Sequence, residues 1–432
     1  MFASEDVGQY LAAVRSRVPL VVAITLFRCL PFLGYTCVSP HVRFLTKLVL
    51  VVIAGCSFFI ITRTGLPVLP ALCQALISLV YFAAAAFFVH RVIRDPARCR
   101  FTPPSLLGTL AFVFVVVPAV ILPGSYRVTA VGVGWEMMLS GYSYCLDTRS
   151  DPSPPSSADA IFFMLVNPVV VYSMRGRRVR RPSVDVWAAL RATLGVVVML
   201  GQDAVVIAMF TIPALRFRGI DDIRDLSSYA GFIGSNALQG VGLYCAHSGL
   251  ASLQIGLMRM SGYEVPERYH LPFLSSGPQD FWRRWNVWIG AWAKLYLFHP
   301  MAQWLRRRSR KAASFAIPIA ATIVTFLLVG ILHDFCRYAA ELVEVNPPFS
   351  LRVTALFLIL GISVVISATL QRTVAIRRLT AGALRPLVRL VGRVLFLQLL
   401  CWMTWFTLGR GATQYFEGIP DRIGPALFPA KE

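Results

Sequence analysis

Long apolar stretches with almost no charged side chains recur along this chain of 432 residues. Several run for roughly 18 residues or more, which is enough for a helix to cross a hydrocarbon core of about 30 Å. Hydrophobic residues make up 56% of the sequence and charged residues only 15%, whereas a soluble domain of this size exposes far more polar surface. The strands of a membrane β-barrel would be shorter and would alternate between apolar and polar residues. The sequence therefore predicts an all-α multi-pass membrane protein.

The apolar stretches predict about 10–12 membrane segments, including re-entrant or interfacial helices. They are residues 18–38, 44–62, 66–90, 105–123, 128–146, 160–174, 187–213, 228–257, 284–304, 313–340, 349–370 and 386–409. We expect them to form a single domain over residues 18–410, between a polar lead at 1–17 and a short polar tail at 411–432. The stretch 284–304 is aromatic and only moderately apolar, so it is expected to be re-entrant or buried.

The positive charge of the chain indicates its general partners. The formal net charge is +21, and arginine supplies nearly all of it. Basic loops beside apolar helices follow the positive-inside rule and contact anionic lipid headgroups. Nucleic-acid binding needs a basic face on a soluble domain, and no such domain is predicted here. We therefore expect membrane lipid as a partner and no nucleic acid.

Two basic segments, at 91–100 and 175–181, conflict with a simple count of membrane crossings. Three full crossings between them would place the two segments on opposite sides of the membrane, against the positive-inside rule. One of the stretches within 105–174 is therefore expected to be re-entrant or interfacial. Such backbone is tolerated at membrane depth where protein or a water-filled cavity surrounds it.

Several common site motifs are absent from the sequence. The nine cysteines show no CxxC pair and no zinc spacing, so we expect no metal site. There is no GxSxG elbow, P-loop or HExxH motif. An HxxxxD pattern of the kind found in glycerolipid acyltransferases runs from His90 to Asp95, but two fixed positions in a basic loop are a weak signal.

His333 lies near the end of an apolar stretch, after residues 320–332, in which the polar side chains are two threonines. Ionisable groups at membrane depth are costly and indicate a functional site unless a partner explains them. A histidine, with an unperturbed pKa of about 6.5, suits proton abstraction from a hydroxyl group. The alternative is a histidine that is hydrogen-bonded between helices. Asp334 is adjacent and would point off another helix face.

A second polar segment surrounds Asn286. Tryptophans recur around it at a spacing of three to four, which predicts one shared helical face or an interfacial aromatic belt: Trp282, Trp285, Trp288 and Trp292. Arg283, Arg284 and Asn286 fall off that face. Asparagine can donate to a carbonyl group, and arginine can hold a phosphate or carboxylate.

The segment Phe281-Trp282-Arg283-Arg284-Trp285-Asn286, followed by His333 in an apolar stretch, resembles the membrane-bound O-acyltransferase (MBOAT) family. The likeness is to its bacterial branch of alginate O-acetyltransferase-like and D-alanyl-transfer proteins. It is good over residues 240–335 and fainter over 132–175. This chain has Asn286 where the branch usually has histidine, and His247 where the branch has an acidic residue.

The resemblance implies an MBOAT-like fold and transfer of an acyl group, with acetyl favoured, to a hydroxyl of a cell-surface glycan or its precursor. It implies His333 as general base and Asn286 as the group that orients the acyl carbonyl. Arg283, Arg284, Trp285, Trp282 and His247 are expected to bind substrate. The co-substrate would be an acyl thioester, on coenzyme A or an acyl carrier protein, with no bound cofactor and with a partner acyltransferase subunit left open. The branch also implies a bacterial inner membrane.

Two alternatives remain open at this stage. In the first alternative, the acceptor is a lipid alcohol or a secondary-metabolite hydroxyl in place of a glycan, and Asn286 favours this slightly. The other alternative is a non-catalytic membrane protein that kept the fold and lost turnover, which the altered residues beside His333 favour. A transporter often has an internal repeat, and the sequence shows none.

Overall fold

The computed structural model describes residues 77, 80–95, 101–121, 124–149, most of 151–178, parts of 187–205, 223–260, 263–308, 315–341, 351–371 and parts of 386–401. The predicted lead, the stretches 18–38 and 44–62, and the tail lie outside these residues. Nearly all of the described chain is helical, and its strands are one antiparallel pair, β1 (Arg177–Arg178) with β2 (Tyr263–Glu264). The predicted all-α membrane fold is therefore confirmed, whereas the number of segments and the domain bounds stay predictions.

The described helices, with short 3-10 and π segments labelled η, are η2 Val89–Ile93, α4 Pro103–Ala111, η3 Phe112–Val116, α5 Val117–Ile121, α6 Gly124–Thr148, α7 Ser157–Leu165, η4 Tyr172–Met174, α9 Leu226–Met260, η7 Pro272–Leu274, α10 Pro278–Arg284, α11 Val287–Ala293, η8 Lys294–Phe298, α12 His299–Arg308, α13 Ala316–Glu341 and α14 Arg352–Leu370.

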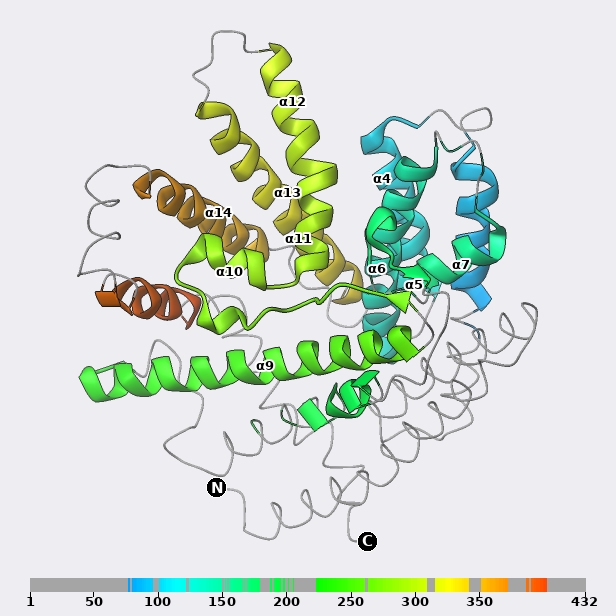
Figure 1. Ribbon diagram of the computed structural model, residues 1–432. Coiled ribbons are helices and arrows are strands. Elements are labelled where there is room, and N and C mark those ends of the chain that lie inside the picture. Colours follow the sequence, from blue (N-terminus) through cyan, green and yellow to red (C-terminus); the bar gives the residue numbers. More distant parts are fainter. Residues whose placement is uncertain are drawn as a thin grey trace, which may run out of the picture.

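Among the described residues, three helical stretches are long and apolar enough to cross a membrane: Pro103–Ile121, Ala316–Cys336 and Arg352–Leu370. They match the predicted stretches at 105–123, 313–340 and 349–370. Figure 1 shows α12 and α13 side by side with α14 next to them, while the 35-residue helix α9 runs crosswise below α10. The described fold therefore contains helices of more than one orientation.

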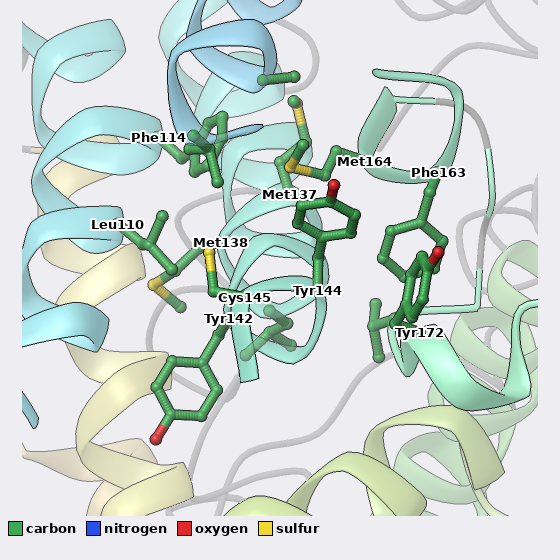
Figure 2. Close-up of a cluster of buried hydrophobic side chains, with 14 of the residues drawn as sticks. Leu110, Phe114, Met137, Met138, Tyr142, Tyr144, Cys145, Phe163, Met164 and Tyr172 are labelled. Carbon is green, nitrogen blue, oxygen red and sulfur yellow. The ribbon is translucent and has the colours of Figure 1, made fainter. Parts of the chain in front are cut away.

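The largest core lies between α4, α6 and the segment around α7. Figure 2 shows its side chains, among them Phe114, Met138, Tyr144, Phe163 and Tyr172. Tyr144 and Phe163 both lie edge-on against Tyr172, with ring centroids 5.2 Å and 5.0 Å away. This aromatic packing holds α6 in place, and α6 carries two residues of the candidate site.

The stretch predicted at 160–174 contains a helix too short to cross a membrane. Its helix, α7, has nine residues and is about 13 Å long, less than half of a hydrocarbon core of about 30 Å. The chain then runs outside any helix or strand through Val169, Val170 and Val171, which are at most 2% exposed. Ser143 of α6 donates to the Val170 carbonyl at 2.7 Å. Buried backbone of this kind fits a re-entrant segment.

The basic ends of several helices gather at one end of α6. The Arg94 guanidinium donates to Thr148, and the backbone N–H of Ser173 donates to Asp147, so the two basic segments meet there. Tyr296 also donates to Asp147, whereas Trp292, one turn earlier, donates to the Leu139 carbonyl. The helix from α11 to α12 therefore runs in the same direction as α6 and carries its arginines to the same end. Basic segments at one end of the helices are the arrangement that the positive-inside rule expects.

Asp334 joins α13 to the start of α14. Its carboxylate is fully buried and accepts hydrogen bonds from the backbone N–H groups of Val353 and Thr354 and from the Thr354 hydroxyl, at 3.2, 2.7 and 2.7 Å. The first N–H groups of a helix lack partners within it, so an acidic group here stabilises α14. A Cβ at Gly330 would lie 2.6 Å from the Cα of Thr354, so the two helices approach closely.

We expect Asp334→Ala to lower the free energy of unfolding by roughly 3 kcal/mol, because it leaves buried donors without an acceptor. Asp334→Asn keeps one carbonyl oxygen and should cost about half of that. Thermal unfolding of the detergent-purified protein measures both changes. Equal melting temperatures for Asp334→Ala and the wild type would show that the contact contributes nothing to stability.

Candidate functional site

His333 lies on α13 between two aromatic rings. Its ring centroid is 5.0 Å from that of Trp135 on α6 and 4.8 Å from that of Phe357 on α14. The Nδ1 atom is 2.7 Å from the Val329 carbonyl oxygen. A carbonyl oxygen can only accept, so Nδ1 carries the proton and Nε2 of the neutral ring carries a free lone pair. The imidazole is therefore a base within apolar walls.

The tryptophan segment is broken at Trp285, so the predicted single helical face is wrong. The helix α10 ends at Arg284, Trp285 is extended, and α11 begins at Val287. Trp288 and Trp292 are buried, and their indole N–H groups donate to backbone carbonyls. An interfacial belt would expose these two rings, so that alternative is wrong for them.

Asn286 occupies the break itself. Its backbone is left-handed, with φ +40°, a conformation that asparagine tolerates better than most residues. Its side-chain Oδ1 caps α11 by accepting from the Ile289 N–H at 3.5 Å. It also accepts from Arg268 Nε at 3.2 Å. The amide oxygen is thus engaged, and the two N–H groups of the amide are the part that a substrate carbonyl can use.

Arg268 and Glu136 complete the site, and the sequence reading did not single them out. Arg268 is 7% exposed, donates to Asn286, forms an ion pair with Glu136 at 3.3 Å and lies 5.1 Å over the Trp288 ring. Glu136 follows Trp135, the residue against His333. The structure therefore links His333 to Asn286 through α6 and one buried arginine.

The other predicted site residues lie at different distances from this centre. His247 on α9 donates from Nδ1 to the Leu243 carbonyl at 2.8 Å and interacts electrostatically with Arg268 and Glu136. Arg283 is exposed and makes no ion pair with the described residues. Trp285 lies in an aromatic cluster with Tyr269 and Phe281, at 5.3 and 5.4 Å. Of these three, only His247 interacts with the Arg268–Glu136 pair.

Arg284 has a structural partner on its own helix. Its guanidinium donates to Asp280 at 3.0 Å and to the His270 carbonyl at 3.2 Å. Burial alone would raise the pKa of Asp280, but hydrogen bonds from the Ser276 N–H and from Arg284 together hold it below its usual value. The stability that this pair contributes is present at neutral pH and is lost in acid, as the pH falls below the ordinary range of a carboxyl group.

The HxxxxD histidine lies outside this centre. His90 is 9% exposed, and its Nδ1 is 2.7 Å from the Tyr144 hydroxyl of α6. This contact between η2 and α6 gives His90 a structural role.

Two substitutions of Asn286 separate its cap from a role in transfer. Asn286→Asp keeps the capping oxygen and loses the amide N–H groups, so its free energy of unfolding should stay within about 0.5 kcal/mol of the wild type. Its transfer rate should fall about tenfold or more if the N–H groups orient the acyl carbonyl. Asn286→Ala loses the cap and disfavours the left-handed backbone, at a cost of about 1–2 kcal/mol. Thermal unfolding and a transfer assay on both variants measure the stability and the transfer rate. An unchanged transfer rate in Asn286→Asp would show that Asn286 acts only as the helix cap.

Parts of this chain are similar in sequence to parts of known proteins. The chain matches no family model. It is 25% identical over 91 residues to the teichoic acid D-alanyltransferase of Bacillus subtilis, covering 21% of this chain and 23% of that protein. It is 31% identical over 91 residues to a probable alginate O-acetylase AlgI of Pseudomonas syringae, covering 21% and 16%. It is 28% identical over 152 residues to a probable long-chain-alcohol O-fatty-acyltransferase of Arabidopsis thaliana, covering 33% and 40%. The chain thus covers less than half the length of each relative.

Proposed function

Because its relatives indicate that this chain is a member of the membrane-bound O-acyltransferase family, we propose that it transfers an acyl group from a thioester donor to a hydroxyl acceptor. The favoured group is acetyl, and the favoured acceptor is a cell-surface glycan or its precursor. The relatives named alginate O-acetylase and teichoic acid D-alanyltransferase support this choice. The donor would be acyl-coenzyme A or an acyl carrier protein. The protein would lie in a bacterial inner membrane.

The observation that carries the proposal is His333 Nε2, which lies between aromatic rings and has no hydrogen-bond partner among the described residues. In the proposed step, Nε2 takes the proton of the acceptor hydroxyl while its oxygen attacks the acyl carbon. The carbon–sulfur bond then breaks, and the leaving thiolate receives the proton from His333. The Asn286 amide orients the acyl carbonyl, and the apolar walls limit hydrolysis of the thioester by water.

The positions of His333 and Trp135 along their helices support entry of the donor and the acceptor from opposite sides. Ala316 begins α13 at the end of the helices near the α12 arginines, and His333 lies about 26 Å further along α13. Thr148 ends α6 at the same basic end, and Trp135 lies about 20 Å from it along α6. If the basic end faces the cytoplasm, a soluble thioester donor has to reach deep into the helices. The acceptor would then enter from the opposite side.

A lipid alcohol as acceptor is the second candidate. The plant relative, named as a long-chain-alcohol O-fatty-acyltransferase, has the longest of the three matches, at 152 residues. The non-catalytic alternative is supported by the changed residues beside His333, such as Asp334. That support is weakened by the structure, because the buried Asp334 carboxylate serves α14.

The test is acyl transfer by the purified chain in lipid vesicles, with labelled acetyl-coenzyme A and two acceptors offered in parallel, a uronic-acid oligosaccharide and a long-chain alcohol. Label on the oligosaccharide supports the favoured acceptor, and label on the alcohol supports the second. No ester with any donor or acceptor, while the protein remains folded, would favour the non-catalytic alternative.

A further inference from the structure

Trp282 holds a buried indole N–H to which the described part of the chain offers no acceptor. Two other tryptophans of the same segment differ in this respect. The Trp288 N–H donates to the Pro266 carbonyl at 3.1 Å, and the Trp292 N–H donates to the Leu139 carbonyl at 3.0 Å. Buried polar groups in proteins are nearly always paired, and an unpaired one calls for an explanation such as a missing ligand.

The place of Trp282 indicates which ligand that is. Its ring centroid is 5.3 Å from that of Phe326 and 5.8 Å from that of Phe357. Phe357 is also the ring against His333, at 4.8 Å. The indole and the imidazole thus contact the same phenyl ring, and α10, which carries Trp282, ends two residues before Asn286. A neutral acceptor such as a carbonyl oxygen suits an N–H between aromatic walls better than a charged group does.

We propose that the Trp282 indole N–H donates a hydrogen bond to the carbonyl oxygen of the acyl thioester, an inference that rests on the proposed acyl transfer. When the acceptor oxygen bonds to the acyl carbon, the carbonyl electron pair moves onto that oxygen, which becomes negative and binds the N–H more strongly. The pair returns as the carbon–sulfur bond breaks. The proton passes from the acceptor hydroxyl to His333 Nε2 and then to the thiolate. A fixed donor in an apolar site stabilises such an oxyanion without reorganising.

Three matched substitutions test the assignment: Trp282→Phe, Trp288→Phe and Trp292→Phe. Each removes the same ring atoms, and Trp288 and Trp292, which are 1% exposed, also lose more packing than the less buried Trp282. We expect Trp282→Phe to lower kcat about a hundredfold with a change of less than about threefold in the KM for acetyl-coenzyme A. Its melting temperature should fall less than those of Trp288→Phe and Trp292→Phe, because it loses no hydrogen bond to the described residues and less buried ring surface. Replacing Trp282 with 3-benzothienylalanine, which keeps the ring shape without the N–H, should lower kcat equally.

The possible results distinguish a failure of the proposed Trp282 role from a failure of the proposed acyl transfer. Transfer by the wild type together with an unchanged kcat in Trp282→Phe and in the benzothienylalanine chain would overturn the inference alone. A melting temperature of the benzothienylalanine chain well below that of the wild type would show that the N–H already has a partner, and would overturn it too. A wild-type chain that transfers nothing would overturn both. If Trp282→Phe does not fold, the benzothienylalanine chain decides.

Discussion

His333→Ala is expected to lower acyl transfer by about a thousandfold or more, since it removes the base that takes the acceptor proton. The fold should survive, because the half-buried ring makes two aromatic contacts and one hydrogen bond to its own helix. The loss should appear in kcat with little change in the KM for the thioester. Single-turnover transfer from a labelled thioester measures it, together with the melting temperature.

A histidine elsewhere in the chain provides the control. His299 is exposed at the start of α12, and its described ring contact is the adjacent Phe298. His299→Ala should therefore retain the transfer rate and the melting temperature of the wild type. Equal turnover in His333→Ala and His299→Ala would remove His333 from the mechanism and favour its alternative role between helices.

Arg268→Met is expected to lower transfer about a hundredfold, although Arg268 need not touch the substrate. It removes the hydrogen bond that fixes Asn286 and the ion pair to Glu136, and a shift of about 1 Å at a reacting group can cost that much rate. The free energy of unfolding should fall by roughly 2 kcal/mol, less than for a fully buried pair, because the Glu136 side chain is 36% exposed and can be hydrated.

A double-mutant cycle separates the two contacts of Arg268. Glu136→Gln alone should lower transfer less than Arg268→Met, because the Asn286 contact remains. The combined variant should resemble Arg268→Met, since the ion pair is already lost. Arg283→Ala, at an exposed arginine of the same segment, is the matched control and should change stability by no more than about 0.5 kcal/mol. A strictly additive cycle would show that Glu136 does not act through Arg268.

The sequence predicted those parts of the fold that depend on local composition. The apolar stretch 313–340 corresponds to α13, Ala316–Glu341, and His333 lies near the end of its candidate membrane span, Ala316–Cys336. The basic segments also led to the expectation of a re-entrant or interfacial stretch within 105–174, where α7 has only nine residues. These features follow from hydrophobicity and charge, which act on each segment largely by itself.

The parts that the sequence did not predict depend on contacts between distant segments. Arg268 and Glu136 are 132 positions apart, and neither stands out in its own surroundings. The tryptophan spacing looked like one helix because periodicity does not record the left-handed backbone at Asn286. The role of Asp334 was also hidden, because its partners lie on α14. His333 and Asn286 as catalytic residues stay predictions.

The segment from Arg94 to Ser173 leaves one end of α6 and returns to it, and this has a consequence for insertion. If these helices span a membrane, a segment that leaves one end and returns to it crosses an even number of times, so the chain comes back to the side from which it started. The orientation of α13 in the membrane would then be the same as if this segment were absent. The ribosome and translocon could insert α13, and with it His333, in one orientation whether or not this segment has already assembled.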